Sequence, residues 1–254
     1  MALKLVQLNI EGSRHLDVVI PFLKELQPDV ACIQELREAD IDRFKKELGI
    51  QCTFAPMVLG GGHTYGVGIL STIALTAVGI NQYGGNEGAL QDHVSHDKQK
   101  MHDSTKYLLL TGDFQKGGET FHIATTHFPV TDHGVATDFQ RKDMEKMLEL
   151  LEQEGEFVLT GDFNAPRGGE IFTMLAAKYK DNIPVEVVTS LDYDIHRAGG
   201  AKLIADAQTL GLKGLMVDGI FSTPGYHVSN VQGHTGVSDH CAFSAEISKS
   251  SDSF

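Results

Sequence analysis

Tryptophan is absent from this sequence of 254 residues, and cysteine is scarce. The three cysteines, Cys32, Cys52 and Cys241, are odd in number and widely spaced, so the pattern indicates neither a disulfide framework nor a C-x-x-C metal site. Cys32 lies in the apolar run DVACIQE, where we expect a small buried side chain.

Long apolar runs are also missing. No stretch approaches the roughly 20 apolar residues that a helix needs to cross a bilayer. The N-terminal segment MALKLVQLNIEG alternates like a β-strand and lacks the apolar region and small-residue cleavage site of a secretory signal. We therefore expect no stable membrane insertion and a cytoplasmic location.

Basic residues are outnumbered, because 21 lysines and arginines face 34 aspartates and glutamates, and the formal net charge is −13. Proteins that coat nucleic acids usually carry a basic stripe, since neutralising phosphates supplies most of their affinity. The sequence has no such run of lysine or arginine. The balance argues against a general nucleic-acid coat, but it allows an enzyme that holds one phosphate through a metal ion.

Apolar residues make up 41% of the chain, which is enough for a sizeable core. Apolar runs and alternation predict strands at 3–9, 28–35, 52–59, 65–71, 72–80, 105–113, 119–128, 157–164, 214–223, 226–232 and 241–247. Helical spacing and end signals predict helices at 15–27, 41–49, 137–155 and 170–181. Many strands follow one another like hairpins, so at least part of the sheet should be antiparallel.

Two polar segments interrupt this pattern. We interpret 82–104, with its histidines His93, His96 and His102, as a long solvated loop rather than a zinc site, and 182–213 as irregular. No linker rich in proline, glycine or serine divides the chain. We expect one α/β domain at 1–248 and a short polar tail at 249–254.

Polar residues stand where several apolar strands stop: Asn9, Glu35, His127, Asp162 with Asn164, Asp218, and Asp239 with His240. A carboxylate at a buried strand end costs desolvation energy unless a partner or a cation meets it. One such residue is readily explained as a turn or a cap. Six separate strand ends favour a site, because loops at one edge of a sheet commonly build sites.

The side chains at these ends have related chemistry. Oxygen ligands from Glu, Asn and Asp suit a hard cation such as Mg²⁺ or Mn²⁺. The chain has no Gly-x-x-x-x-Gly-Lys phosphate loop and no Gly-x-Ser-x-Gly nucleophile turn. Metal-assisted hydrolysis of a phosphoester is the reaction class that remains.

Six motifs carry a resemblance to a known family: LNIEG at 8–12, PDVACIQE at 28–35, TTHF at 125–128, TGDFNAP at 160–166, VDGIF at 217–221 and GVSDHCAF at 236–243. In this order they resemble the endonuclease/exonuclease/phosphatase superfamily over residues 3 to 247. The resemblance implies a DNase I-like α/β fold, a four-layer sandwich of two mixed β-sheets flanked by helices.

The resemblance also implies roles for particular residues. Asn9, Glu35 and Asp239 would hold one or two Mg²⁺ or Mn²⁺ ions. The catalytic residues would be His127 on the phosphate, Asp162 and Asn164 on the attacking water, and the pair of Asp218 and His240 on the phosphate or as the base. The choice of base stays open. His196 and Arg197 are candidates for contacts with the substrate.

The chain departs from the family pattern at two positions. Glu11 stands where apurinic endonucleases often have a second acid, and we interpret it as a turn residue, with a second metal ligand as the alternative. Gly219 replaces the usual aromatic residue after Asp218, which makes the surroundings of the Asp218–His240 pair harder to predict.

The four letters TGDF occur twice after apolar runs, once with Asp113 and once with Asp162. The segment after Asp113 is a short glycine-containing connection to the strand that leads to His127. If that strand brings His127 to the functional edge, the connection lies at the opposite edge. We therefore expect Asp162 to act and Asp113 to be a hairpin residue remote from the metal.

These observations predict a metal-dependent hydrolase that cleaves a phosphodiester by water attack, either a nuclease or a small-molecule or nucleotide phosphodiesterase. A phosphomonoesterase or a sphingomyelinase-like lipid phosphodiesterase is the alternative on the same fold. A catalytically inactive phosphate-binding module is the alternative of another class. We expect a phosphoester substrate, with nucleic acid or a nucleotide among the candidates, and a monomer without a protein partner.

Overall fold

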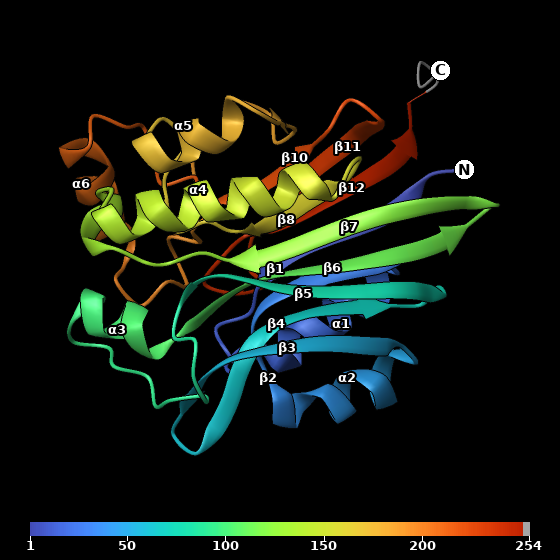
Figure 1. The fold of residues 1–254 in the computed structure, drawn as a ribbon, viewed down its shortest axis with the longest axis horizontal. Coiled ribbons are helices and arrows are strands. Elements are labelled where there is room, and N and C mark those ends of the chain that lie inside the picture. Colours follow the sequence, from blue (N-terminus) through green and yellow to red (C-terminus); the bar gives the residue numbers. More distant parts are fainter. Residues whose placement is uncertain (251–254) are drawn as a thin grey trace.

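The computed structural model describes residues 1–250, and its strands form two six-stranded sheets (Figure 1). The first sheet contains, in order across it, β11 (Tyr226–His234), β12 (Ala242–Lys249), β1 (Leu3–Asn9), β2 (Val30–Arg37), β4 (His63–Ser71) and β3 (Gln51–Gly60). The second contains β5 (Leu75–Gly85), β6 (Lys106–Lys116), β7 (Glu119–His127), β8 (Val158–Asp162), β10 (Asp218–Ser222) and β9 (Lys180–Asp181).

Both sheets are mixed and share one pairing pattern. The central pair of each sheet, β1–β2 in the first and β7–β8 in the second, is parallel, whereas the other neighbours are antiparallel. Strands of a parallel pair end at the same edge of their sheet. The C-terminal ends of these central strands therefore define one edge of the sandwich, where Asn9, His127 and Asp162 stand.

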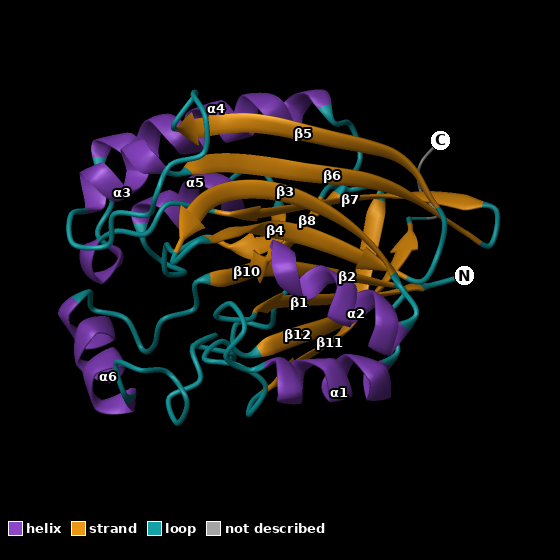
Figure 2. Ribbon diagram, turned by 90° about the horizontal axis from the view of Figure 1, so that it is seen from below, coloured by secondary structure: helices purple, strands orange, loops and turns teal. Residues whose placement is uncertain are grey.

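Helices cover the two outer faces of the sandwich (Figure 2). Helices α1 (Leu16–Leu26) and α2 (Ile41–Leu48) lie on the first sheet, and α4 (Asp138–Gln153) and α5 (Glu170–Ala176) lie on the second. The expected four-layer sandwich is confirmed. None of the helices within residues 1–250 is long and apolar enough to span a membrane.

Strand alternation decides which side chains face the other sheet. In β1, Leu3 and Leu5 belong to the large core between the layers, whereas Val6 and Leu8 pack in a second core beneath α1 and α2. Each such side chain contributes roughly 1.5–3 kcal/mol when it is fully buried. Because the side-chain period of a strand is two, Asn9 points toward the second sheet, as Leu3 and Leu5 do.

The two polar segments contain helices that the sequence analysis does not predict. The supposed loop 82–104 holds the end of β5 and α3 (Lys98–Ser104), which Asp97 caps by accepting a hydrogen bond from the Lys100 backbone N–H at 3.0 Å. The irregular region 182–213 holds α6 (Gly200–Thr209), with Leu203 and Ala207 in a small separate core. Both helices are short and bury few apolar residues, so their helical spacing is weak in the sequence.

Other boundaries differ by a few residues. The helix expected at 170–181 ends at Ala176, and its last residues form the edge strand β9. Two 3-10 turns, η1 (Glu38–Asp40) and η2 (Asp132–Gly134), complete the elements of residues 1–250. The last residues of the expected polar tail, 251–254, lie outside the described residues.

Candidate active site

The polar strand ends meet at the edge defined by the central parallel pairs. His127 at the end of β7 is in register with Asp162 at the end of β8, and Asp162 is in register with Asp218 at the start of β10. From the first sheet, Asn9 reaches across and donates a hydrogen bond from Nδ2 to Asp162 Oδ2 at 3.0 Å. The site therefore lies between the two sheets.

Two glutamines join the sheets behind this edge. Gln34 donates from Nε2 to Thr125 Oγ1 at 3.0 Å, and Gln7 donates from Nε2 to Asp218 Oδ1. Both glutamines are fully buried. Since a buried hydrogen bond that loses one partner costs about 1–3 kcal/mol, these contacts fix how the halves of the site face each other.

A β-bulge aims Glu35 into the site. Residues 34 and 35 of β2 lie between the register pairs Ile33–Gly68 and Leu36–Gly66, where β4 has one residue, and Glu35 has a positive φ of 55°. Ile33 and Leu36 both pack beneath the helices, so the alternation of β2 skips at this point. Glu35 consequently accepts a hydrogen bond from Asn9 Nδ2 at 3.2 Å, instead of lying under α1 and α2.

Asp162 lies at the centre of the site, where side chains from several elements contact it. Its carboxylate is 1% exposed. Besides Asn9, the Nε2 atoms of His127 and His240 lie 3.4 and 3.8 Å from Asp162 Oδ2. The other oxygen, Oδ1, accepts a hydrogen bond from the backbone N–H of Asn164 at 2.9 Å. Side chains from β1, β7 and the segment before β12 thus converge on one buried carboxylate.

Asp218 and His240 form a buried pair, with His240 Nδ1 2.7 Å from Asp218 Oδ2. Burial alone would lower the pKa of His240, but the charges of Asp218, Asp162 and Asp239 outweigh it and raise the pKa from 6.5 to about 10. The positive charge of a divalent cation nearby would act in the opposite direction. The aromatic residue missing at Gly219 is explained by crowding, because a Cβ there would lie 2.5 Å from the Phe221 ring.

The raised pKa of His240 predicts a pH-dependent contribution to stability in EDTA. A histidine whose pKa is higher in the folded state stabilises the fold fully below its unfolded pKa, near 6.5, and loses this contribution as the pH rises toward about 10. The melting temperature of wild type should therefore exceed that of His240→Gln most at pH 6, and the difference should shrink toward pH 10. Thermal unfolding across this range measures it, and a difference that grows with pH would contradict the assignment.

Asp239 and Glu11 form a second acidic group beside that of Asp162 and Asp218. Burial raises the pKa of Asp239, and the charges of Glu11 and Glu35 raise it further, against the effect of His240. Asn9 donates to Glu35 and accepts from the backbone N–H of Glu11, whose carboxylate lies beside that of Asp239. Glu35 and Asp239 are therefore brought to the same edge, although 204 positions separate them in the numbering of the chain.

Two groups of side chains offer metal ligands within 4.8 Å of one another: Asp162, Asp218 and His240 in one, and Glu11, His15 and Asp239 in the other. Glu11 is nine-tenths buried, yet its Oε1 has no hydrogen-bond partner. Buried carboxylates that repel each other are costly unless positive charge neutralises them, and the two arginines nearest to Glu11, Arg14 and Arg197, approach only its Oε1, at 3.4 Å. The donor set, mostly carboxylate oxygens with imidazole, fits a divalent cation.

The remaining predicted residues lie around this centre. Asn164 adopts a positive φ of 49° and donates from Nδ2 to the Phe128 backbone oxygen at 2.9 Å. Burial lowers the pKa of His196, and the charge of His240 lowers it further. Arg197 Nε is 3.4 Å from Glu11 Oε1. All ten predicted site residues are thus near one edge of the sandwich.

Asp113 lies elsewhere, as the hairpin predicts. It pairs in register with His122, five residues before His127 on β7, which corresponds to about 16 Å along the strand. Its Oδ1 is 2.6 Å from His122 Nδ1, and the other ring nitrogen of His122 is 2.9 Å from Glu154 at the end of α4. Asp113 therefore faces the outer helix layer, on the other side of the sheet from Asp162.

The sequence analysis favours a turn for Glu11, with a metal ligand as the alternative, and does not predict a role for two glutamines. Glu11 does occupy a turn, with a φ of 47°, but its carboxylate also lies in the site together with His15. Gln7 and Gln34 were not singled out, although both are polar residues at inward positions of apolar strands. That break in the alternation is the signal that would have found them.

Comparison with known proteins agrees with this geometry. The model of the endonuclease/exonuclease/phosphatase family matches residues 6–240. No curated protein gives a significant match.

Solved structures of similar fold include an endonuclease/exonuclease/phosphatase from Bacteroides vulgatus, with 17% identity, a TM-score of 0.70, and coverage of 98% of this chain and 100% of that one. The human Nocturnin catalytic domain with bound sulfate has 15% identity, a TM-score of 0.68 and coverage of 98% and 94%. A mannosyl-6-phosphatase from Bacteroides thetaiotaomicron has 13% identity, a TM-score of 0.68 and coverage of 97% and 99%. The TM-scores and the coverage show a shared fold. The family model spans nearly the whole chain, so the protein belongs to the endonuclease/exonuclease/phosphatase family.

Proposed function

We propose that this protein is a metal-dependent hydrolase that cleaves a phosphodiester by water attack on phosphorus. Members of its family are typically metal-dependent phosphoester hydrolases. The observation that carries the proposal is the convergence of Asn9, His127 and His240 on the buried carboxylate of Asp162. An inactive phosphate-binding module would not require this buried and mutually repelling set of charges.

Glu35, Asp239 and Asn9 would hold the divalent cation, with Glu11 as a further ligand. A cation there would polarise a phosphoryl oxygen and neutralise part of the charge that develops on it. The residues have the oxygen donors that Mg²⁺ and Mn²⁺ prefer. The proposal requires only one ion.

The protein's own groups supply the rest of the chemistry. Asp162 accepts hydrogen bonds through both oxygens, so its carboxylate is oriented to hold a water and to take a proton from it. His127 is 21% exposed, so its imidazole can reach a bound phosphate. Asp218 holds His240 by its Nδ1 and leaves Nε2 directed to the site, where it can donate to a phosphoryl oxygen.

The charges of the site favour a diester over a monoester. Glu11, Glu35, Asp162, Asp218 and Asp239 all lie at or beside the centre. A phosphodiester carries one negative charge at neutral pH, whereas a phosphomonoester carries nearly two and meets stronger repulsion. The phosphatase from Bacteroides thetaiotaomicron has the same fold, so a monoesterase is the second candidate.

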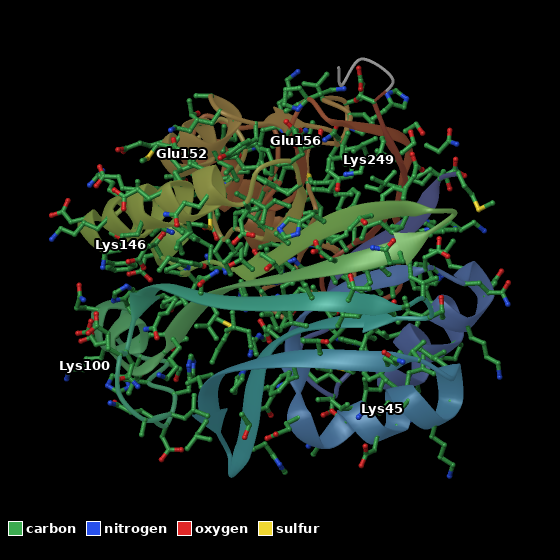
Figure 3. The ribbon with its side chains drawn as sticks, turned by 45° about the vertical axis from the view of Figure 1, so that its right-hand side comes forward. Lys45, Lys100, Lys146, Glu152, Glu156 and Lys249 are labelled. Atoms are coloured by element: carbon green, nitrogen blue, oxygen red, sulfur yellow. The ribbon has the colours of Figure 1, made fainter. Side chains whose placement is uncertain are left out.

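The sequence has no run of lysine and arginine residues that would supply a long basic track. Lys45 on α2, Lys100 on α3 and Lys146 on α4 project from separate parts of the surface (Figure 3). Binding along many phosphates of a long nucleic acid depends on such a track. We therefore place a short or small diester ahead of a long nucleic acid as the substrate.

Hydrolysis of bis(p-nitrophenyl) phosphate, p-nitrophenyl phosphate and sphingomyelin with Mg²⁺, Mn²⁺ or EDTA tests the proposal. We expect metal-dependent release of nitrophenol from the diester, at a higher kcat/KM than from the monoester. Faster hydrolysis of the monoester would favour a phosphomonoesterase. Faster hydrolysis of sphingomyelin would favour a lipid phosphodiesterase. Calorimetric binding of Mg²⁺ without hydrolysis of any ester would favour the inactive module.

A further inference from the structure

Two arginines meet one carboxylate oxygen at the rim of the site. Arg14 Nε and Arg197 Nε both lie 3.4 Å from Glu11 Oε1, although the two arginines come from distant parts of the chain. We call Arg14 and Arg197 the arginine pair. Their side chains are 63% and 70% exposed, whereas that of Glu11 is 7% exposed. The guanidinium groups therefore lie at the surface directly above a buried acid.

The turn after β1 fixes Glu11 beneath the pair. The backbone N–H of Glu11 donates to Asn9 Oδ1 at 3.1 Å, and Glu11 Oε2 is 3.0 Å from His15 Nε2. The next residue, Gly12, has a φ of 68°, and a Cβ there would lie 3.2 Å from the Tyr65 ring. Glu11 and Arg14 are thus held by the same short turn that follows the metal-ligand candidate Asn9.

The loop that carries Arg197 is attached to the catalytic segment. The backbone N–H of Cys241 donates to Ser190 O at 2.7 Å, and that of Asp192 donates to Asp239 O at 2.9 Å. His196 N–H in turn donates to Asp192 O at 2.8 Å. Arg197 therefore follows directly on residues that are hydrogen-bonded to the strand end with Asp239 and His240.

The pair has binding capacity that Glu11 does not use. At 3.4 Å neither guanidinium makes a hydrogen bond to Glu11 Oε1, which has no hydrogen-bond partner. One carboxylate charge is shared by two guanidinium charges, and each guanidinium has five N–H donors. Free donors on two convergent arginines match the oxygens of a phosphate group.

The pair is also adjacent to the reaction centre. The ligand atoms of Glu11 and Asp239 lie within 4.8 Å of each other, and Asp239 directly precedes His240. An anion bound by the pair would therefore lie beside the phosphate under attack, where one substrate molecule can supply both groups. The net charge of the chain is −13, so its overall charge does not attract anions. The two exposed arginines supply local positive charge beside the acidic site.

We propose that the arginine pair is an anion subsite that binds a second phosphate of the substrate. The inference rests on the proposed function and narrows it, because the preferred substrate is then a phosphodiester that carries a further phosphate group. Two sources have this chemistry: the neighbouring backbone phosphate of an oligonucleotide, and a terminal phosphate of a small molecule.

Matched chromogenic substrates test the subsite. Nitrophenyl diesters of thymidine 5′-phosphate and of thymidine 3′-phosphate are compared with the same diesters carrying a phosphate on the other hydroxyl. For wild type we expect the added phosphate, in one of the two orientations, to raise kcat/KM about tenfold or more, mainly through KM. A nitrophenyl dinucleotide in the same orientation distinguishes a backbone phosphate from a terminal one.

The variant Arg14→Gln/Arg197→Gln should bring the ratio of kcat/KM with and without the added phosphate close to one. Arg141→Gln is the matched control, because Arg141 pairs with Asp138 and Glu170 on the outer helix layer and should keep the ratio. No preference in wild type for either orientation, or an equal loss of the ratio in the control, would overturn the subsite.

Binding gives a readout that does not depend on turnover. Calorimetry in Ca²⁺ buffer should show thymidine 3′,5′-bisphosphate binding wild type about tenfold more tightly than either monophosphate, and the double variant should lose this difference. If no diester is hydrolysed but this arginine-dependent preference is present, the proposed function fails and the subsite stands. If diesters are hydrolysed and bisphosphate is bound no better than monophosphate, the subsite fails and the function stands.

Discussion

The Asp162→Asn variant is expected to lower kcat for bis(p-nitrophenyl) phosphate by about 10³-fold, within the range for loss of an acid–base group. The amide keeps the size of the side chain and can still accept the hydrogen bond from Asn9 through its oxygen. It loses the negative charge that orients the water and takes its proton. Steady-state kinetics with saturating Mg²⁺ measure the effect, and unfolding curves show that the variant is folded.

Asp113→Asn is the matched control, because the same TGDF letters surround both residues. Asp113 contacts His122 on the outer face of the sheet, about 16 Å along the strands from His127. We expect its kcat to stay within about threefold of wild type, with a modest loss of stability from the weakened contact to His122. An equal loss of kcat in the two variants would remove the distinction between the two aspartates.

Removal of divalent cations is expected to have an effect of comparable size. EDTA should abolish hydrolysis, and Mg²⁺ or Mn²⁺ should restore it, because the buried carboxylates of the site require a cation both to bind a phosphate and to neutralise one another. Glu35→Gln should raise the Mg²⁺ concentration for half-maximal activity by at least about tenfold, as loss of even an outer-shell partner commonly does.

Glu38→Gln controls for the loss of one negative charge in this segment. Glu38 is exposed in η1, three residues after Glu35. Its Mg²⁺ dependence should match that of wild type. Full activity in EDTA, or the same shift in both variants, would show that Glu35 is not a ligand.

The sequence predicts the site well where strands end regularly. Asn9 and His127 stand at the ends of strands that alternate, and Asp162 ends the apolar run of the next strand, so the apolar pattern indicates their edge. The hairpin between β6 and β7 likewise predicts that Asp113 is remote from His127 and the site. These inferences need only the two-residue alternation of side chains along a strand and the short length of the connection between β6 and β7.

The sequence analysis names Glu35 and Arg197 as candidates, but the irregular backbone that places them could not be predicted. Glu35 faces the site only because a bulge reverses the alternation of β2, and its positive φ has no signal in a glutamate. Glu11 serves both as a turn residue and as part of the site, which its sequence context cannot distinguish. Arg197 reaches Glu11 because backbone hydrogen bonds attach residues 190–192 to the strand end near Asp239, a pairing between segments with no shared pattern.

A crystal structure with Mn²⁺, recorded at a wavelength where manganese scatters anomalously, tests most directly whether these side chains share a cation. We expect a single strong anomalous peak, or two adjacent ones, with carboxylate oxygens of both Glu35 and Asp239 within about 2.5 Å of manganese. The peak should disappear in Glu35→Gln crystals at the same Mn²⁺ concentration. A peak that contacts neither residue, or none at an Mn²⁺ concentration that supports full activity, would contradict the account.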